Sequence, residues 1–178
     1  MDDLQTISEV QKPNLLICFY DIDNFSSVSR SKPDATEVFE LLSTMAKITY
    51  AKIDGSSGHV VKFIGDAALL VFPESHVDEG VNLLLALKQA LEEFFQSEGI
   101  AVRLRFSLHY GEAAIGPFGP EAHESLDVFG DNVNVAAALA KGQHRGRFII
   151  SPQVFRKLNP KTRKVFHKYT PPIVYLAD

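Results

Sequence analysis

The sequence has few residues that could form a covalent cross-link and no long apolar segment that could anchor it in a membrane. Its 178 residues include no tryptophan and one cysteine, Cys18, which lies in the apolar segment NLLICFY. A lone cysteine cannot form an internal disulfide, and its buried setting suits a reducing compartment. No apolar run approaches the ~20 residues of a membrane-spanning helix. The acidic start MDDLQTISEV also lacks the apolar centre of a signal peptide. These absences predict a cytoplasmic protein with no membrane partner.

Excess charge of either sign is also missing. The formal net charge is −4, from 22 acidic and 18 basic residues, which gives no reason to expect nucleic acid or an anionic membrane as a partner. An anionic substrate would therefore need local cations, a metal ion or backbone amides. The composition, 46% hydrophobic and 22% charged, is that of an ordinary globular domain.

The hydrophobic pattern predicts one α+β domain over residues 14–178, preceded by a flexible leader at 1–13. A buried strand, an amphipathic helix, two short strands, a second helix and an alternating strand follow one another. The dipeptide Gly65-Asp66 between the two short strands is a Gly-first hairpin signal. This order predicts a ferredoxin-like, palm-type βαββαβ core with an antiparallel central sheet. Further strands and a helix are expected after it.

In such a core the first strand and the central hairpin are neighbours. Asp21, at the end of the first strand, is then expected to face Asp66 at the hairpin tip. Alone, each would be a common turn residue in solvent. Two adjacent carboxylates are unfavourable unless a cation lies between them. Hard oxygen ligands beside a phosphate-bearing substrate suit Mg²⁺ or Mn²⁺, and two such ions can activate a hydroxyl and clamp a polyphosphate.

Four segments carry a family resemblance: FYDIDNFS, VVKFIGDAALLVF, LRFSLHYGEAAIGPFG and LDVFGDNVNVAAAL. They resemble, in order and at about the same spacing, four blocks of the class III adenylate/guanylate cyclase catalytic domain. The resemblance runs from about residue 15 to residue 175. It implies that Asp21 and Asp66 bind two Mg²⁺ or Mn²⁺ ions together with the backbone carbonyl of Ile22. Lys168 is the nearest match to the family's phosphate-binding lysine, although Tyr169 replaces the glycine that usually follows.

The resemblance also implies how a nucleotide would be read. Lys62 and Asp127 match the purine-reading pair, and Asn134 matches the asparagine that orients the ribose and the transition state. A lysine donor and an aspartate acceptor complement adenine, whereas guanine reverses that pattern. The pair therefore favours ATP. His109 and Gly111 match positions that are mainly structural, and a structural role is the better interpretation of His109.

Two positions depart from the family pattern. Ala138 stands where an arginine usually follows the asparagine by one helical turn, and loss of such a charge-stabilising group typically costs ~2.7–4 kcal/mol. Arg145 or Arg147 is a candidate substitute. Asn24 stands where glycine is frequent, a tolerable change because asparagine accepts the left-handed conformation.

The resemblance leads to an adenylate cyclase domain that converts Mg·ATP to cyclic AMP and pyrophosphate, slowed by Ala138. It implies a head-to-tail homodimer, with the metal aspartates from one chain and the purine and ribose readers from the other. The alternative is a catalytically weakened relative that acts as a dimeric nucleotide-binding regulatory module. A diguanylate cyclase is disfavoured because Ala67-Ala68 follows Gly65-Asp66. Regulation is expected to come from an upstream protein or a small ligand.

Overall fold

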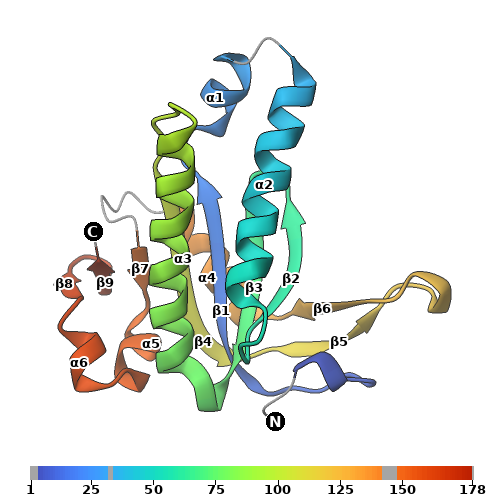
Figure 1. Ribbon diagram of the computed structural model, residues 1–178. Helices are drawn as coiled ribbons and strands as arrows, with labels where there is room; N and C mark the ends of the chain where they lie inside the picture. Colours follow the sequence, from blue (N-terminus) through green and yellow to red (C-terminus); the bar gives the residue numbers. More distant parts are fainter. Residues whose placement is uncertain (1–3, 32–33, 142–147, 178) are drawn as a thin grey trace.

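The computed structural model describes residues 4–31, 34–141 and 148–177. Its centre is a seven-stranded sheet in the order β2-β3-β1-β4-β7-β9-β8 (Figure 1). Neighbouring strands are antiparallel except β4 and β7, which run parallel. The strands of this sheet are β1 (Asn14–Ile22), β2 (His59–Ile64), β3 (Ala67–Pro73), β4 (Leu104–Glu112), β7 (Phe148–Ile150), β8 (His167–Tyr169) and β9 (Val174–Ala177).

Residues 14–112 form the predicted ferredoxin-like core. Its four strands have the spatial order β2-β3-β1-β4, which places the central hairpin beside β1 as expected. Within the α+β architecture, β7, α5 and the β8–β9 hairpin extend this core, as the sequence predicted. The helices and short helical turns are η1 (Leu4–Thr6), α1 (Phe25–Ser31), α2 (Ala35–Ile53), η2 (Glu74–His76), α3 (Val77–Ser97), η3 (Glu121–His123), α4 (Asp131–Lys141), α5 (Pro152–Lys157) and α6 (Pro160–Arg163).

Local signals explain the ends of the two long helices. Asp34 caps α2, because its side chain accepts a hydrogen bond of 2.8 Å from the Thr36 amide. Helix α3 ends at Ser97, and Gly99 follows with φ of +71°, the left-handed conformation that ends many helices.

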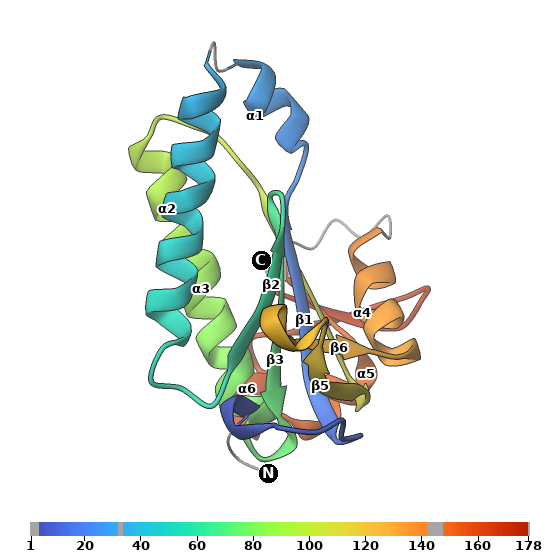
Figure 2. The same ribbon diagram turned by 90° about the vertical axis from the view of Figure 1, so that its right-hand side faces the viewer.

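Helices α2 and α3 cover one face of the sheet, and α4 lies on the other (Figure 2). Helix α5 contributes Val154 to the same core as α2 and α3. On the face with α2 and α3, the ring of Phe106 stacks on Tyr20 at 5.0 Å and on Phe148 at 5.5 Å. The Tyr20 hydroxyl lies 2.6 Å from Thr49 Oγ1 on α2, so its polar end is satisfied inside the core. This packing ties α2 to the strand that carries Asp21.

The opposite face carries an arm that the sequence pattern did not fully predict. Strand β5 (Ala114–Phe118) was expected, but it leaves the main sheet and pairs with β6 (Ser125–Phe129) in a separate two-stranded sheet. We call this pair the arm. Strand β6 was not predicted. In Figure 1 the arm projects away from the body of the domain.

The leader segment, residues 4–13, packs against the domain rather than standing apart from it as a flexible leader. Leu4 is buried in the core on the arm side of the sheet. Gln11 and Ile115 of β5 exchange two backbone hydrogen bonds of 2.9 Å. Among the described residues, no helix is long and apolar enough to cross a membrane.

Candidate active site

The central hairpin carries Asp66 to the end of β1. Ile64 pairs with Ala67 across the two-residue turn, and Gly65 has φ of +64°. A positive φ at the first turn position alone is typical of a type II′ hairpin turn, which favours glycine there. Since Tyr20 pairs with Ala68 across β1 and β3, Asp66 and Asp21 lie at the same end of the sheet. The predicted convergence of these two carboxylates is therefore present.

Asp21 lies in an environment that disfavours its negative charge. Burial raises the pKa of its carboxyl above the ordinary value, Arg105 opposes this rise, and the charges of Asp66 and Asp23 add to it. The buried Oδ1 atom has no hydrogen-bond partner among the residues that the structure describes. A buried carboxylate oxygen without a partner costs free energy. It is therefore well suited to accept a cation.

Arg105 is part of this site, and the sequence analysis missed it. It stands directly opposite Asp21 in the β1–β4 pairing, with Nε at 3.9 Å from Asp21 Oδ1. Its guanidinium also donates a hydrogen bond to Asp23. The signal was present in the segment VRLRFSLHY, where Arg103 and Arg105 alternate with the apolar residues of the opposite face.

The residues at this end of the sheet fit a divalent metal ion. Asp21 and Asp66 supply hard carboxylate oxygens, and the buried Oδ1 of Asp21, which accepts no hydrogen bond, is the observation that supports a cation there. The side chain of Ile22 is buried in the core, so only its main chain can take part. In the described ranges no group of three or more His, Cys, Asp or Glu side chains is placed to hold a metal. Main-chain and substrate oxygens would have to complete the coordination.

The expected purine readers meet within one chain. Lys62 Nζ lies 2.6 Å from Asp127 Oδ2, and the Val128 amide donates to Asp127 Oδ1 at 2.8 Å. The Lys62 ammonium also lies 5.7 Å from the centre of the Phe129 ring. Phe129 was not anticipated, and two positions along a strand separate it from Asp127, so both face the same side. A donor and an acceptor are thus held side by side next to an aromatic ring.

A β-bulge aims Lys62 at Asp127. Val60 pairs with Leu70 and Lys62 pairs with Leu69, so Val61 is an extra residue on β2. Leu69 belongs to the core on the arm side of the sheet. With regular pairing Lys62 would instead oppose Ala68, whose side chain joins the core under α2 and α3. The bulge therefore turns Lys62 toward the arm, where Asp127 lies.

Close contact with β4 fixes helix α4. Asn132 donates to the Glu112 carbonyl at 2.8 Å, and its Oδ1 lies 3.0 Å from His109 Nε2. Burial lowers the pKa of His109, so the ring is neutral at pH 7 and donates from Nε2. A Cβ on Gly111 would lie 2.5 Å from the Asn132 side chain, so only glycine allows this approach. These contacts agree with the structural role expected for His109 and Gly111.

The remaining predicted residues lie on the surface. Asn134 and Ala138 are exposed on α4, one helical turn apart. Lys168 is exposed on β8, which is separated from β1 by β4, β7 and β9. At ~4.8 Å per strand, Lys168 lies about 19 Å from the Asp21 strand. Within one chain the structure therefore does not bring Lys168 to the aspartates. Arg145 and Arg147 fall outside the described residues.

Asn24 adopts φ of +58°. This is the left-handed conformation that asparagine tolerates better than most residues. The sequence-based expectation for this position is confirmed.

Residues 7–172 match the family model of the adenylate and guanylate cyclase catalytic domain. The chain belongs to this family. The predicted family and the predicted α+β fold are both confirmed.

Relatives of this cyclase domain include adenylate and guanylate cyclases. An adenylate cyclase of Anabaena cylindrica is 25% identical over 155 residues, which are 82% of this chain and 31% of that protein. A bacterial light-regulated adenylyl cyclase superposes with a TM-score of 0.80 at 23% identity, covering 96% of this chain and 53% of the other. The guanylate cyclase domain of RhGC from Catenaria anguillulae, in complex with GTP, gives 0.75 at 23% identity, covering 89% and 87%. This cyclase domain spans less than a third of the curated relatives it matches.

Proposed function

We propose that this domain converts Mg·ATP to 3′,5′-cyclic AMP and pyrophosphate. The ribose 3′-oxygen attacks the α-phosphorus, the bond from the α-phosphorus to the bridging oxygen of the leaving pyrophosphate breaks, and the hydroxyl proton is released to solvent. The observation that carries the proposal is the meeting of Asp21 and Asp66 at one end of the sheet, with a buried Asp21 oxygen that accepts no hydrogen bond.

In this proposal Asp21, Asp66 and the carbonyl of Ile22 would hold two Mg²⁺ or Mn²⁺ ions. When bound, such ions supply positive charge to the triphosphate and favour ionisation of the 3′-hydroxyl. Arg105 keeps the metal-free aspartates in place through its contacts with Asp21 and Asp23. It also adds a positive charge beside the position of the phosphates.

The preference for ATP rests on Lys62 and Asp127. Lys62 would donate to N1 of adenine, and Asp127 would accept from the exocyclic amine. Guanine presents a donor and an acceptor in the opposite order, so both contacts would be mismatched. A mismatched polar group in a partly buried site costs on the order of 1–3 kcal/mol. Because relatives of both base specificities share the fold, this pair is the basis for choosing adenine.

The complete site is proposed to form between two copies arranged head to tail. Asn134 and Lys168 are exposed rather than directed at the aspartates of their own chain, so they are available to a partner. Apolar side chains are exposed around the base readers: Phe118 at 56%, Phe129 at 48% and Ile64 at 54%. The rings of Phe118 and Phe129 lie 5.0 Å apart. A clustered apolar surface of this kind favours an interface, and a second copy would cover it symmetrically.

A second candidate function is a nucleotide-binding module with little or no turnover. Ala138 favours it, because the exposed methyl group on α4 offers nothing to stabilise charge on the α-phosphate. Such a protein would bind metal–ATP and dimerise without forming product.

Purified protein incubated with ATP or GTP and Mn²⁺, with products identified by mass spectrometry, tests the proposal. Cyclic AMP from ATP, in excess over cyclic GTP from GTP, is the expected result. ATP binding without cyclic product would support the second candidate. Preferential formation of cyclic GTP would overturn the assignment of Lys62 and Asp127.

A further inference from the structure

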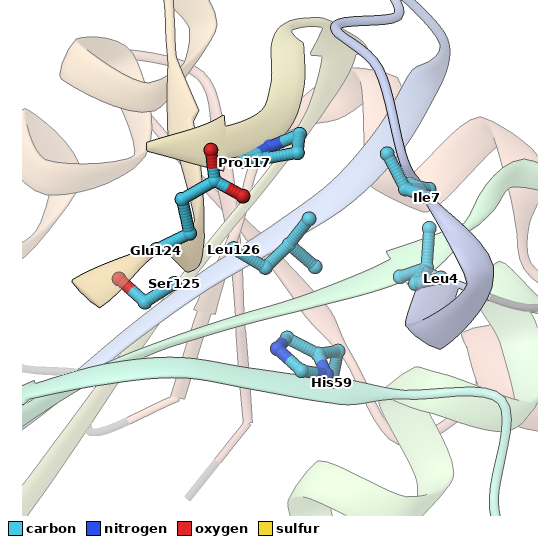
Figure 3. A pocket seen from close by; sticks show the side chains of 7 residues that line it. All are labelled: Leu4, Ile7, His59, Pro117, Glu124, Ser125 and Leu126. Carbon is cyan, nitrogen blue, oxygen red and sulfur yellow. The ribbon is translucent and has the colours of Figure 1, made fainter. Parts of the chain in front are cut away.

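A cavity separate from the aspartates lies between the leader segment, β2 and the arm. Its volume is about 420 Å³, and it is lined by Leu4, Ile7, His59, Pro117, Glu124, Ser125 and Leu126. We call it the leader pocket. Figure 3 shows Leu4, Ile7 and Leu126 turned toward the same space, with the imidazole of His59 pointing into it from β2. The volume falls within the roughly 300–1,000 Å³ range of small-molecule sites.

The lining of the leader pocket favours a ligand with a positive charge. Leu4, Ile7, Pro117 and Leu126 form an apolar wall, and the described lining includes no lysine or arginine. Glu124 is its one acidic residue. Burial lowers the pKa of His59, so this imidazole is uncharged at pH 7. The described lining offers an anion no cationic partner, whereas an ammonium group could pair with the carboxylate of Glu124.

The leader pocket is joined to the base readers through both strands that carry them. Leu126 directly precedes Asp127 on β6, and His59 lies on the same strand as Lys62. The ion pair between Lys62 and Asp127 therefore spans the same two strands that wall the pocket. A molecule that fills the cavity would limit the movement of β6 relative to β2. The leader segment closes the remaining side, held to β5 by the backbone bonds between Gln11 and Ile115.

We propose that the leader pocket is an effector site for a small organic amine, an apolar body with one ammonium group, and that its occupation tightens nucleotide binding. The apolar body lies against Leu4, Ile7 and Leu126, and the ammonium pairs with Glu124. The effect on nucleotide rests on the proposed function of Lys62 and Asp127, whereas binding of the amine does not.

The binding step is tested by NMR titration of the whole ¹⁵N-labelled chain with 2-phenylethylamine. Its matched control is 3-phenylpropanoate, which has a similar body and the opposite charge. The amine should give saturable shifts at the amides of Ile7, His59 and Leu126. The affinity for 3-phenylpropanoate should be at least about fivefold weaker than that for the amine. Glu124→Gln should weaken amine binding about fivefold. Glu121→Gln, an exposed carboxylate in the same connection that does not line the pocket, should not.

The site would be overturned by an absence of saturable shifts at these amides, by equal binding of the amine and the carboxylate, or by undiminished affinity in Glu124→Gln. Shifts confined to residues 4–13 would also overturn it, because they would show a ligand on the leader segment alone.

The coupling is tested by titrating a non-hydrolysable ATP analogue and Mg²⁺ with and without saturating 2-phenylethylamine. We expect at least about fivefold tighter nucleotide binding with the amine, a usual size for coupled sites. Amine binding with no change in nucleotide affinity would overturn the effector role. If the nucleotide fails to bind in either condition while the amine binds, the proposed cyclase function is wrong but the amine site stands.

Discussion

Lys62 and Asp127, 65 positions apart in the chain, are joined by an ion pair of 2.6 Å. The Asp127 side chain is only 8% exposed, whereas that of Lys62 is 40% exposed. Asp127 is thus held by the protein, and the lysine end of the pair is open to a ligand. A purine would meet a preformed donor and acceptor rather than two mobile side chains, which reduces the entropy lost on binding.

Inverting this pair should change base choice. In the double variant Lys62→Glu with Asp127→Cys, we expect the ratio of ATP to GTP turnover to fall at least about tenfold, because the hydrogen-bond polarity is reversed. Steady-state assays with both nucleotides measure the ratio. Lys47→Gln, at an exposed position on α2, makes the same net change in charge, one unit more negative, and serves as the control. An unchanged ratio in a folded double variant would show that these residues do not read the purine.

Asp21 should destabilise the metal-free protein although turnover requires it. Because burial and neighbouring carboxylates raise its pKa, its ionised form is less favourable in the folded than in the unfolded chain. Asp21→Asn should therefore raise the melting temperature of the metal-free protein at pH 7 while abolishing turnover. The gain should vanish below about pH 4, where the carboxyl is protonated in both states.

Metal should reverse that order of stability. Mn²⁺ should raise the melting temperature of the wild-type protein and leave that of Asp21→Asn nearly unchanged, since only the wild type has the buried carboxylate oxygen that accepts no hydrogen bond. Differential scanning fluorimetry at several pH values measures both effects. Glu121→Gln serves as the control, because it removes an exposed carboxylate elsewhere. Equal stabilisation of Asp21→Asn and wild type by Mn²⁺ would contradict the metal assignment.

A site shared between chains predicts complementation. Asp21→Ala and Asn134→Ala proteins should each be inactive alone. Mixed heterodimers should regain up to roughly half of the activity of the wild-type dimer, because one of the two composite sites in each heterodimer is intact. Activity of mixtures, with heterodimers verified by native mass spectrometry, measures this. Inactive verified heterodimers would count against the shared site.

Restoring an arginine on α4 should accelerate the reaction. Ala138 is exposed and lies one turn from Asn134, so a guanidinium can extend there without displacing the core. We expect Ala138→Arg to raise turnover at least about tenfold, or about 1.4 kcal/mol of barrier, with less effect on ATP affinity. Ala138→Lys should gain less, because it lacks the planar fork that fits phosphate oxygens. A dimeric Ala138→Arg protein, verified by size-exclusion chromatography, with no gain in rate would refute this role.

The contact between Gly111 and Asn132 should be sterically tight. Gly111→Ala places a methyl group 2.5 Å from the Asn132 side chain and should destabilise the fold by about 1–3 kcal/mol. In the Asn132→Ala background the same change should cost much less, because the clash is gone. Urea denaturation of the four proteins measures the coupling. Equal costs in both backgrounds would show that Asn132 is not the obstacle.

The amino-acid sequence by itself determined the core and the meeting of Asp21 with Asp66. Long periodic segments such as 35–53 and 77–97 carry enough repeats to indicate helices, and Gly65 marks the hairpin turn through its need for positive φ. Once the order of these elements is known, the ferredoxin-like topology leaves one place for the hairpin, beside β1. The two carboxylates then follow from connectivity alone.

Only the tertiary structure decided how the base readers and the leader segment are arranged. The bulge at Val61, the separate pairing of β5 with β6 and the position of Arg105 opposite Asp21 are all set by the register between strands distant in sequence. A register depends on the summed packing of both faces of the sheet, and a one-residue shift moves a side chain to the other face. Local periodicity carries no such information, so Lys62 could be matched to Asp127 by resemblance but not placed against it.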